Sequence, residues 1–169
     1  MSAQTFNILF ICSGNSCRSP MAEGLMKSKI PAELKDKVTV TSAGTLGIDG
    51  APATRYAIEV AAELGADISE HRSQGMSEEL ARASDVIFAL SVEHKDHLQK
   101  TYPEVSDNVF LLRAFRRAPE EKHPDSIDDP IGRSLAVYRE CCYLINAELD
   151  RILPRLQPLI ENKLTNPEY

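Results

Sequence analysis

Tryptophan is absent from this sequence, and aromatic residues make up only 6% of its 169 residues. No apolar run approaches the length of a membrane span, and no charged leader with an apolar segment precedes the first apolar run. Internal repeats and low-complexity tracts are also lacking. The net charge of -6 argues against general binding of nucleic acid. We therefore expect a chain that is not secreted and binds neither membrane nor nucleic acid.

Cysteine is scarce as well, with four residues in the chain. Cys12 and Cys17 share one short stretch, and Cys141 and Cys142 are adjacent, which is unlike the disulfide frameworks of small secreted proteins. Reduced thiols fit this spacing, so we expect a cytoplasmic location. The hydrophobic content of 43% and the charged content of 26% are ordinary for a globular protein. We expect one domain over residues 1–169, with fraying over residues 162–169.

Four short apolar runs predict strands, and helical patterns lie between them. The predicted strands are Phe6–Ile11, Val38–Thr41, Val86–Leu90 and Val109–Leu112. The predicted helices cover residues 21–28, 52–64, a segment that begins at Ser77, 93–100 and 135–156. Pro154 and Pro158 are expected to kink or end the last helix. Val38–Thr41 alternates apolar and polar residues, which is typical of an edge strand. Strands that alternate with helices predict an α/β fold with a parallel sheet.

The strongest chemical signal is the stretch from Cys12 to Pro20, which reads CSGNSCRSP. It links the first predicted strand to the first predicted helix, and in this geometry loop N–H groups and a helix N-terminus bind an anion. The planar fork of Arg18 suits two phosphate oxygens, and such a positive field favours the thiolate form of Cys12. The pattern predicts a thiolate nucleophile aimed at a phosphorus atom. The expected phosphate-binding residues are Ser13, Gly14, Asn15, Ser16, Cys17 and Arg18.

Hydrolysis through a cysteine also needs an acid for the leaving group. The region from Ala118 to Asp128 reads as a loop, and Asp129 and Pro130 follow it. Each of the two adjacent aspartates is a candidate for the acid or for a solvated turn residue. No spacing of metal ligands is present, so we expect no metal and no cofactor. Three of the four histidines, His94, His97 and His123, are expected at the surface.

Four segments in the same order resemble the low molecular weight protein tyrosine phosphatase family, to which the bacterial protein-arginine phosphatases also belong. These segments are the loop Cys12–Pro20, Ser42–Thr45, His71–Ser73 and Asp129-Pro130. The resemblance implies a three-layer αβα sandwich around a four-stranded parallel sheet in the order 2-1-3-4. It also implies hydrolysis of phosphorylated proteins through a cysteinyl-phosphate intermediate. In this reading Cys12, Arg18 and Asp129 are catalytic, with Asp129 as the acid because it precedes proline.

The resemblance also suggests which residues support the loop. Asn15 is expected in a left-handed backbone conformation, tying the loop to Ser42 and His71. His71 would then hold the loop and do no chemistry. Ser19 is expected to donate a hydrogen bond to the Cys12 thiolate, to cap the helix, or to do both.

The other cysteines have simpler expected places. Cys17 is either a filler residue in the loop or a redox partner that captures oxidised Cys12 as a reversible disulfide. Cys142 lies on the apolar stripe of the last helix and is expected in the core, while no role is predicted for Cys141.

The substrate is open between phosphoarginine and phosphotyrosine. The tyrosine-specific animal members have two tyrosines after Asp-Pro, whereas this chain has Ile131 and Gly132, and residues 46–50 contain no aromatic residue either. The arginine phosphatases have a threonine where this chain has Ser16, and an aromatic residue where it has Ile131. The small polar Ser16 favours phosphoarginine, and ordinary phosphotyrosine hydrolysis is the alternative.

Two further classes are weighed against this interpretation. A thioredoxin-coupled arsenate reductase of similar fold needs additional cysteines, and none lies between Cys17 and Cys141. A non-catalytic phosphate-binding module would be expected to lack Cys12, Arg18 or the loop aspartate, and all are present. We expect a monomeric protein phosphatase.

Overall fold

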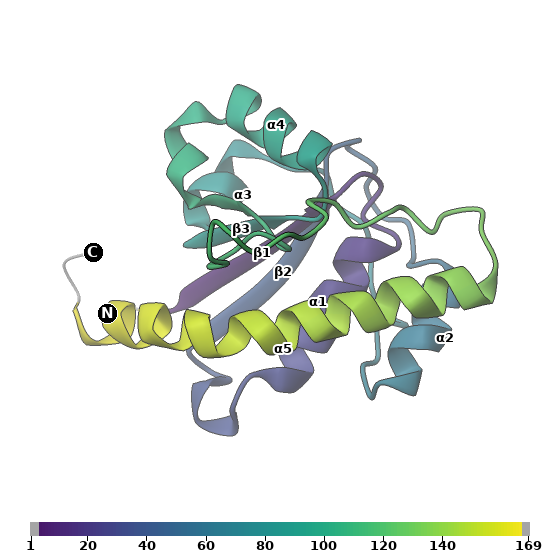
Figure 1. Ribbon diagram of the computed structural model, residues 1–169, viewed down its shortest axis with the longest axis horizontal. Coiled ribbons are helices and arrows are strands. Elements are labelled where there is room, and N and C mark those ends of the chain that lie inside the picture. Colours follow the sequence, from purple (N-terminus) through teal and green to yellow (C-terminus); the bar gives the residue numbers. More distant parts are fainter. Residues whose placement is uncertain (1–3, 167–169) are drawn as a thin grey trace.

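The computed structural model describes residues 4–166 and contains a four-stranded parallel sheet with helices on both faces (Figure 1). The strands are β1 (Phe6–Cys12), β2 (Val38–Gly44), β3 (Val86–Ala89) and β4 (Val109–Leu111). The α-helices are α1 (Arg18–Lys29), α2 (Arg55–Glu63), α3 (Glu78–Ala83), α4 (Val92–Thr101) and α5 (Leu135–Thr165). Two short 3₁₀ helices cover Ala32–Leu34 and Pro103–Asn108. The strand order β2-β1-β3-β4 confirms the predicted order, with β2 at the edge.

The continuous apolar run of β1 is explained by burial on both faces of the sheet. Phe6, Ile8 and Phe10 face the larger core beneath α1, α2 and α5, whereas Leu9 and Ile11 face the smaller core beneath α3 and α4. Figure 1 shows α1, α2 and α5 on one side of the sheet and α3 and α4 on the other, which confirms the three-layer sandwich. The alternation of side chains along the strand thus places both layers.

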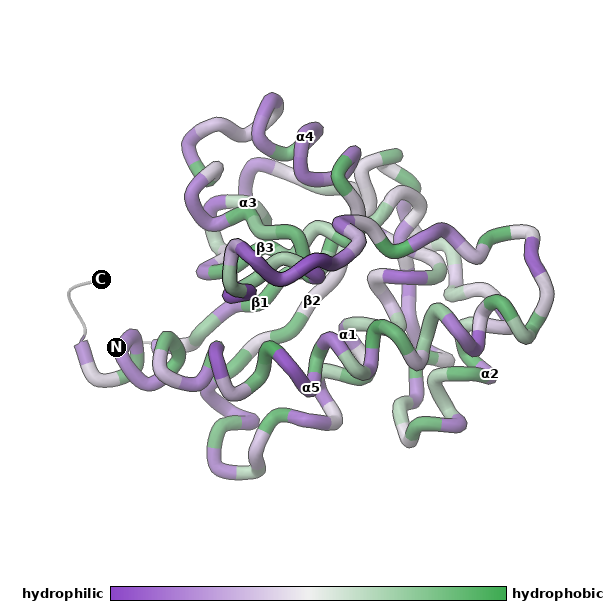
Figure 2. Tube along the Cα trace, viewed as in Figure 1, coloured by the Kyte–Doolittle hydropathy of each residue, from purple (hydrophilic) through white to green (hydrophobic). Residues whose placement is uncertain are grey.

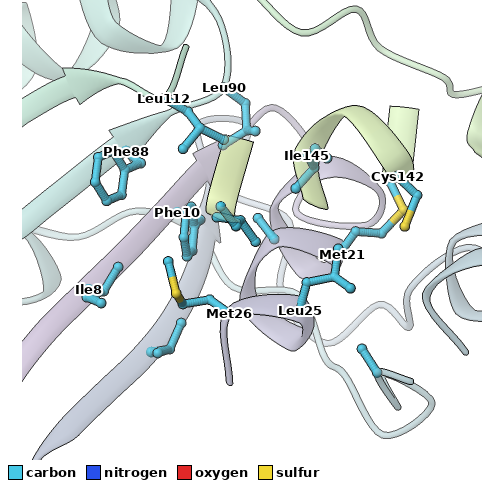
Figure 3. Packing of buried hydrophobic residues seen from close by; sticks show 14 of the residues in the cluster. Ile8, Phe10, Met21, Leu25, Met26, Phe88, Leu90, Leu112, Cys142 and Ile145 are labelled. Atoms are coloured by element: carbon cyan, nitrogen blue, oxygen red, sulfur yellow. The ribbon is translucent and has the colours of Figure 1, made fainter. Parts of the chain in front are cut away.

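The larger core joins β1, β3, α1 and α5 (Figure 3). Phe10 stacks on Phe88 with ring centroids 5.6 Å apart, and Met21 and Leu25 of α1 fill the space toward α5. Cys142 is fully buried in this cluster, as its place on the apolar stripe predicts. This packing fixes α1, whose first turn carries Arg18.

The prediction that proline would kink or end the last helix is wrong about its end. Both Pro154 and Pro158 lie inside α5, which continues to Thr165. Both prolines are exposed, and the apolar stripe on either side of them, including Ile152, Leu156 and Ile160, packs into the core. Tertiary packing therefore outweighs the lost backbone hydrogen bonds.

The end of α5 lies in the stretch where fraying is expected, and it makes an ion pair with the rest of the fold. Lys163 Nζ lies 2.7 Å from a carboxylate oxygen of Asp85, which joins the last turn of α5 to the start of β3. Residues 162–165 are helical. Residues 167–169, where fraying was also expected, lie outside the described residues.

Candidate active site

Residues 13–17 connect β1 to α1 at the carboxyl end of β1. The chain leaves β1 between β2 on one side and β3 on the other, which is the point where strand order reverses and where α/β sheets bind ligands. In Figure 1 this loop lies at the upper end of the sheet, near the segment that joins β4 to α5.

The carbonyl groups of this loop are bound on its outer side. Thr45 N–H donates to Cys12 O at 3.0 Å, Leu46 N–H donates to Ser13 O at 3.0 Å, and Thr54 N–H donates to Ser16 O at 2.9 Å. In a trans peptide the N–H points away from the neighbouring carbonyl. The loop N–H groups therefore turn toward the centre of the loop, as an anion-binding cradle requires.

Gly44 at the end of β2 lets the loop lie this close to the sheet. A Cβ atom built at Gly44 would lie 2.5 Å from Ser13 O and 3.0 Å from Asn15 N, which are backbone atoms with little room to move. Glycine at this position is thus a requirement of close packing.

The Cys12 side chain forms a hydrogen bond with Ser19. Ser19 Oγ lies 2.9 Å from Cys12 Sγ, and Asn15 Nδ2 donates to Ser19 Oγ at 2.8 Å. Since Asn15 occupies an acceptor site of the Ser19 oxygen, the Ser19 proton is available for the sulfur. This arrangement stabilises a thiolate. Ser19 does not cap the helix as the alternative predicted, because α1 begins at Arg18 and the cap position is Cys17.

Asn15 makes several hydrogen bonds that hold the loop in place, as the resemblance implies. Its φ of 54° is in the left-handed region, and Nδ2 also donates to Ser42 Oγ at 2.9 Å. Its Oδ1 accepts from Gln74 N–H at 2.9 Å, and its carbonyl lies 2.8 Å from His71 Nε2. Glu23 of α1 lies behind this group, 3.6 Å from His71 Nδ1. The predicted partners Ser42 and His71 are therefore in place.

Arg18 is buried, with only 5% of the residue exposed. Its Nη1 donates to Ile127 O at 2.9 Å, and its Nη2 lies 3.4 Å from Ser13 Oγ and 3.3 Å from Asp129 Oδ2. Its Nε is buried and has no acceptor among residues 4–166. A buried N–H without an acceptor is costly, and an oxygen of a bound anion would satisfy it.

The two candidate aspartates differ in position. Asp129 lines the same pocket as Cys12 and pairs with Arg18, and its side chain is 40% exposed. Asp128 is exposed and does not line this pocket, and its carbonyl accepts a long contact of 3.8 Å from Cys141 Sγ. The geometry thus favours Asp129 as the acid.

The pocket itself has a volume of about 230 Å³. Cys12 and Arg18 line it together with Asp129, and its rim carries Leu46, Ile48 and Ile131. These three rim side chains are exposed, and Ser16 also lines the pocket. No aromatic side chain lines the pocket within the described part of the chain.

Cys17 lies in the pocket wall and contacts Tyr138 of α5. The Sγ atom is 3.3 Å from Tyr138 Oη and 3.5 Å from Thr54 Oγ1. Burial, followed by the contact with Cys17, raises the pKa of Tyr138 to about 12, so the phenol keeps its proton. The four cysteines are free thiols in this structure.

His94 is the residue that sequence reasoning missed. It was expected at the surface, but it is only 3% exposed, and its Nε2 lies 2.9 Å from Ser13 Oγ. His97 is exposed as predicted, and His123 is partly buried. A usable signal was available: β3 neighbours β1, so residues just after β3 arrive beside the loop that follows β1.

Within residues 4–166, no cluster of three or more histidine, cysteine, aspartate or glutamate residues is arranged to hold a metal ion. The helices of the same region include none with the length and apolar content needed to cross a membrane.

Burial lowers the pKa of His94 to about 4, with Arg18 as the second cause, so this histidine is neutral near pH 7.

The fold and this site define an α/β protein with a thiol-bearing, anion-binding loop at the switch point of its sheet. The profile of a family described as low molecular weight phosphotyrosine protein phosphatase matches residues 7–162. The chain belongs to this family, whose members are cysteine-dependent protein phosphatases.

Similar proteins include both kinds of phosphatase in this family. A probable low molecular weight protein-tyrosine-phosphatase EpsP from Ralstonia solanacearum is 34% identical, over 90% of this chain and 97% of its own. A protein-arginine-phosphatase from Geobacillus stearothermophilus is also 34% identical, with the same coverage of 90% and 97%. The crystal structure of a low molecular weight protein tyrosine phosphatase from T. tengcongensis superposes with a TM-score of 0.81 at 35% identity, covering 90% of this chain and 100% of that one.

Proposed function

We propose that this protein hydrolyses phosphoarginine in phosphorylated proteins, with Cys12 as nucleophile, Arg18 as phosphate ligand and Asp129 as general acid. The observation that carries this proposal is the meeting of these three side chains in one pocket, with Arg18 Nη2 3.3 Å from Asp129 Oδ2. The arginine can therefore contact a phosphoryl group and the acid at once.

In the first step the Cys12 thiolate attacks phosphorus, and the bond between phosphorus and the leaving nitrogen breaks. Asp129 gives its proton to that nitrogen, and the arginine side chain leaves as a guanidinium cation. Arg18 and the loop N–H groups stabilise the charge on the phosphoryl oxygens. In the second step water attacks the cysteinyl-phosphate, Asp129 takes the proton, and the thiolate leaves with the help of Ser19.

The support for phosphoarginine comes from the pocket lining. A guanidinium group is planar and rich in N–H donors, so it needs acceptors around it. Ser16 Oγ and the Asp129 carboxylate line the pocket, and the only hydrogen-bond contact of Ser16 Oγ among residues 4–166 is a long one of 3.7 Å to Cys17 Sγ. Ser16 Oγ is thus available to a substrate guanidinium.

Phosphotyrosine is the second candidate, and the pocket rim favours it. Leu46, Ile48 and Ile131 are exposed by 65%, 46% and 56% at the pocket mouth. Exposed aliphatic side chains at one place favour an apolar partner, and a phenyl ring would cover them. The phenyl ring would have no aromatic side chain to stack on, since none of the described lining residues is aromatic.

Parallel kinetics on phosphoarginine and phosphotyrosine peptides of the same sequence test this proposal. The ratio of the two kcat/KM values should favour phosphoarginine in the natural protein. Ser16→Ile should move the ratio toward phosphotyrosine, because a guanidinium donor left without an acceptor costs about 1–3 kcal/mol. An unchanged ratio, or a natural protein that prefers phosphotyrosine, would contradict the substrate proposal alone.

Cys12→Ser tests the mechanism separately. Turnover should vanish while vanadate or inorganic phosphate still binds, because Arg18 and the loop N–H groups remain. Turnover in this variant, or loss of activity of the natural protein with a chelator, would contradict the cysteine mechanism.

We further propose that the protein acts as a monomer in the cytoplasm on phosphorylated protein substrates, without a cofactor. The support is the set of four free thiols, one of which must stay reduced to act. Light scattering at working concentration should give the mass of one chain.

A further inference from the structure

His94 is a buried, titratable side chain that the proposed mechanism leaves unused. It lies in the first turn of α4, next to the anion-binding loop. Its Nε2 is 2.9 Å from Ser13 Oγ, and its Nδ1 is 2.8 Å from Ser91 Oγ. An imidazole ring that is hydrogen-bonded at both nitrogens has one fixed orientation. Which nitrogen donates depends on the other hydrogen bonds of Ser13 and Ser91.

The first partner is Arg18. Its Nη2 donates to Ser13 Oγ at 3.4 Å, and an arginine can only donate. The Ser13 oxygen therefore turns a lone pair toward Arg18. Its proton can then be donated to His94 Nε2, 2.9 Å away.

The second partner is Ser91, whose Oγ lies 2.8 Å from His94 Nδ1. When Nε2 of a neutral His94 accepts, the ring proton is on Nδ1 and is donated to Ser91 Oγ. Ser91 stands at the cap position of α4 without making a capping hydrogen bond, so its hydroxyl is free for this contact.

We propose that His94 is a positioning residue of the phosphatase site, which fixes Arg18 by orienting the Ser13 hydroxyl. The proposal rests on the proposed function of the site. The guanidinium of Arg18 can only donate, and this favours an order in which Ser13 donates to His94 and His94 donates to Ser91. His94 touches neither substrate nor reacting atoms and acts through Ser13.

The same helix end also holds the segment that carries the acid. Val92 N–H donates to Ser126 Oγ at 3.0 Å, and Ile127 N–H donates to Leu90 O at 2.8 Å. Arg18 Nη1 in turn donates to Ile127 O. The junction between β3 and α4 therefore contacts both the phosphate loop and the approach to Asp129, and Arg18 is held between them.

Two substitutions of His94 separate positioning from packing. The amide of Gln reaches the place of Nε2 and can accept the Ser13 proton, whereas the shorter amide of Asn reaches only the place of Nδ1. His94→Gln should keep kcat/KM within about twofold, and His94→Asn should lower kcat/KM and weaken vanadate inhibition about tenfold, as for one hydrogen bond to a charged group. His97→Asn, on the exposed side of the same helix, is the control and should change neither value.

The link through Ser13 is tested by combination. Ser13→Ala should cause the same loss as His94→Asn, and the double variant should lose no more than either single one. Equal losses in His94→Gln and His94→Asn at equal melting temperature, or losses that multiply in the double variant, would overturn the proposal.

If His94→Asn does not fold, Ser13→Ala is compared with Ser13→Thr, which keeps the hydroxyl. Ser13→Ala should weaken vanadate inhibition several-fold more than Ser13→Thr, and equal weakening would likewise overturn the proposal. All of these outcomes are distinct from turnover by Cys12→Ser, which would undo the proposed function itself.

Discussion

The loop that carries Cys12 and the segment that carries Asp129 face the same pocket but are held in opposite ways. Four carbonyl groups of the loop, those of Cys12, Ser13, Asn15 and Ser16, are bound from outside by other parts of the chain. Among residues 4–166, the side chain of Asp129 has only Arg18 and the N–H of Ile131 in its own turn as partners, at 3.3 Å and 3.1 Å. The loop residues are buried or partly buried, whereas the acid is exposed.

The segment that leads to Asp129 is anchored away from the acid. Arg117 and Arg151 both pair with the buried carboxylate of Glu148 at 2.8 Å, which holds the residues after β4 against α5. Figure 2 colours much of the segment between β4 and α5 as hydrophilic, and little of it enters the core. Ile127, two residues before the acid, is buried in the core.

This difference follows from what each part must do. Stabilising the charge on phosphorus requires dipoles that are already in position when the substrate arrives. An acid must instead reach leaving groups of different size, which an exposed residue on a loop can do. Changes in the loop should therefore alter both stability and activity, and changes at Asp129 should alter activity alone.

The largest effect on the rate of hydrolysis is expected at the exposed Asp129. Asp129→Asn should slow hydrolysis about 10²–10⁴-fold for a poor leaving group and far less for nitrophenyl phosphate, whose leaving group departs without a proton. The melting temperature should be unchanged. Single-turnover rates on both substrates measure this. Asp128→Asn is the matched control, and the same pattern in that variant would show that the neighbouring carboxylate is the acid.

The second prediction concerns pH and the buried side of the site. An unfolded chain titrates its histidines near pH 6.5, whereas burial, with Arg18 as the second cause, lowers the pKa of His94 to about 4. Between these values the unfolded chain binds a proton that the folded chain does not, so the free energy of unfolding falls as pH is lowered from 6.5 to 4.

Between pH 7 and pH 4.5 this loss should be about 2 kcal/mol in the natural protein and should be missing in His94→Gln. Urea unfolding at pH 7 and at pH 4.5 measures the difference between the two proteins. His97→Gln should keep the loss, since His97 is exposed in the folded chain as well. Parallel pH curves for the natural protein and His94→Gln would contradict the cited pKa.

The strand order follows from the family resemblance and the candidate chemistry of the loop from its local sequence, whereas His94 was missed, and the reason is physical. Cys12, Arg18 and Asn15 lie within one short stretch, so their chemistry is local in sequence. His94 reaches the site only because β3 pairs with β1, and the run that holds it has no local pattern of burial. Pro154 was misjudged for the same reason, because the packing that keeps α5 helical comes from distant residues.

A third prediction tests how tightly the loop is packed. Gly44→Ala places a Cβ 2.5 Å from Ser13 O and should destabilise the fold by about 1–3 kcal/mol, since the backbone must shift. Gly14→Ala is the matched control, because a Cβ there would meet only Ser16 Oγ at 3.5 Å. Thermal unfolding of both variants compares them. Equal melting temperatures would mean that the loop backbone can shift at little cost in stability, as we expect for the segment that carries the acid.

The smallest effect is expected from the two thiols of the loop. Peroxide should oxidise Cys12 to a sulfenic acid, and the Cys17 thiol should then displace water from it to form a disulfide. Tyr138 Oη lies 3.3 Å from Cys17 Sγ and holds this thiol toward α5. Tyr138→Phe should release Cys17 and raise the fraction of Cys12 recovered by reductant a few-fold, because the removed contact is a weak sulfur hydrogen bond. Peptide mapping after oxidation decides the matter. Cys12 found as sulfinic or sulfonic acid with Cys17 free, in both proteins, would show that the wall of the pocket holds Cys17 out of reach.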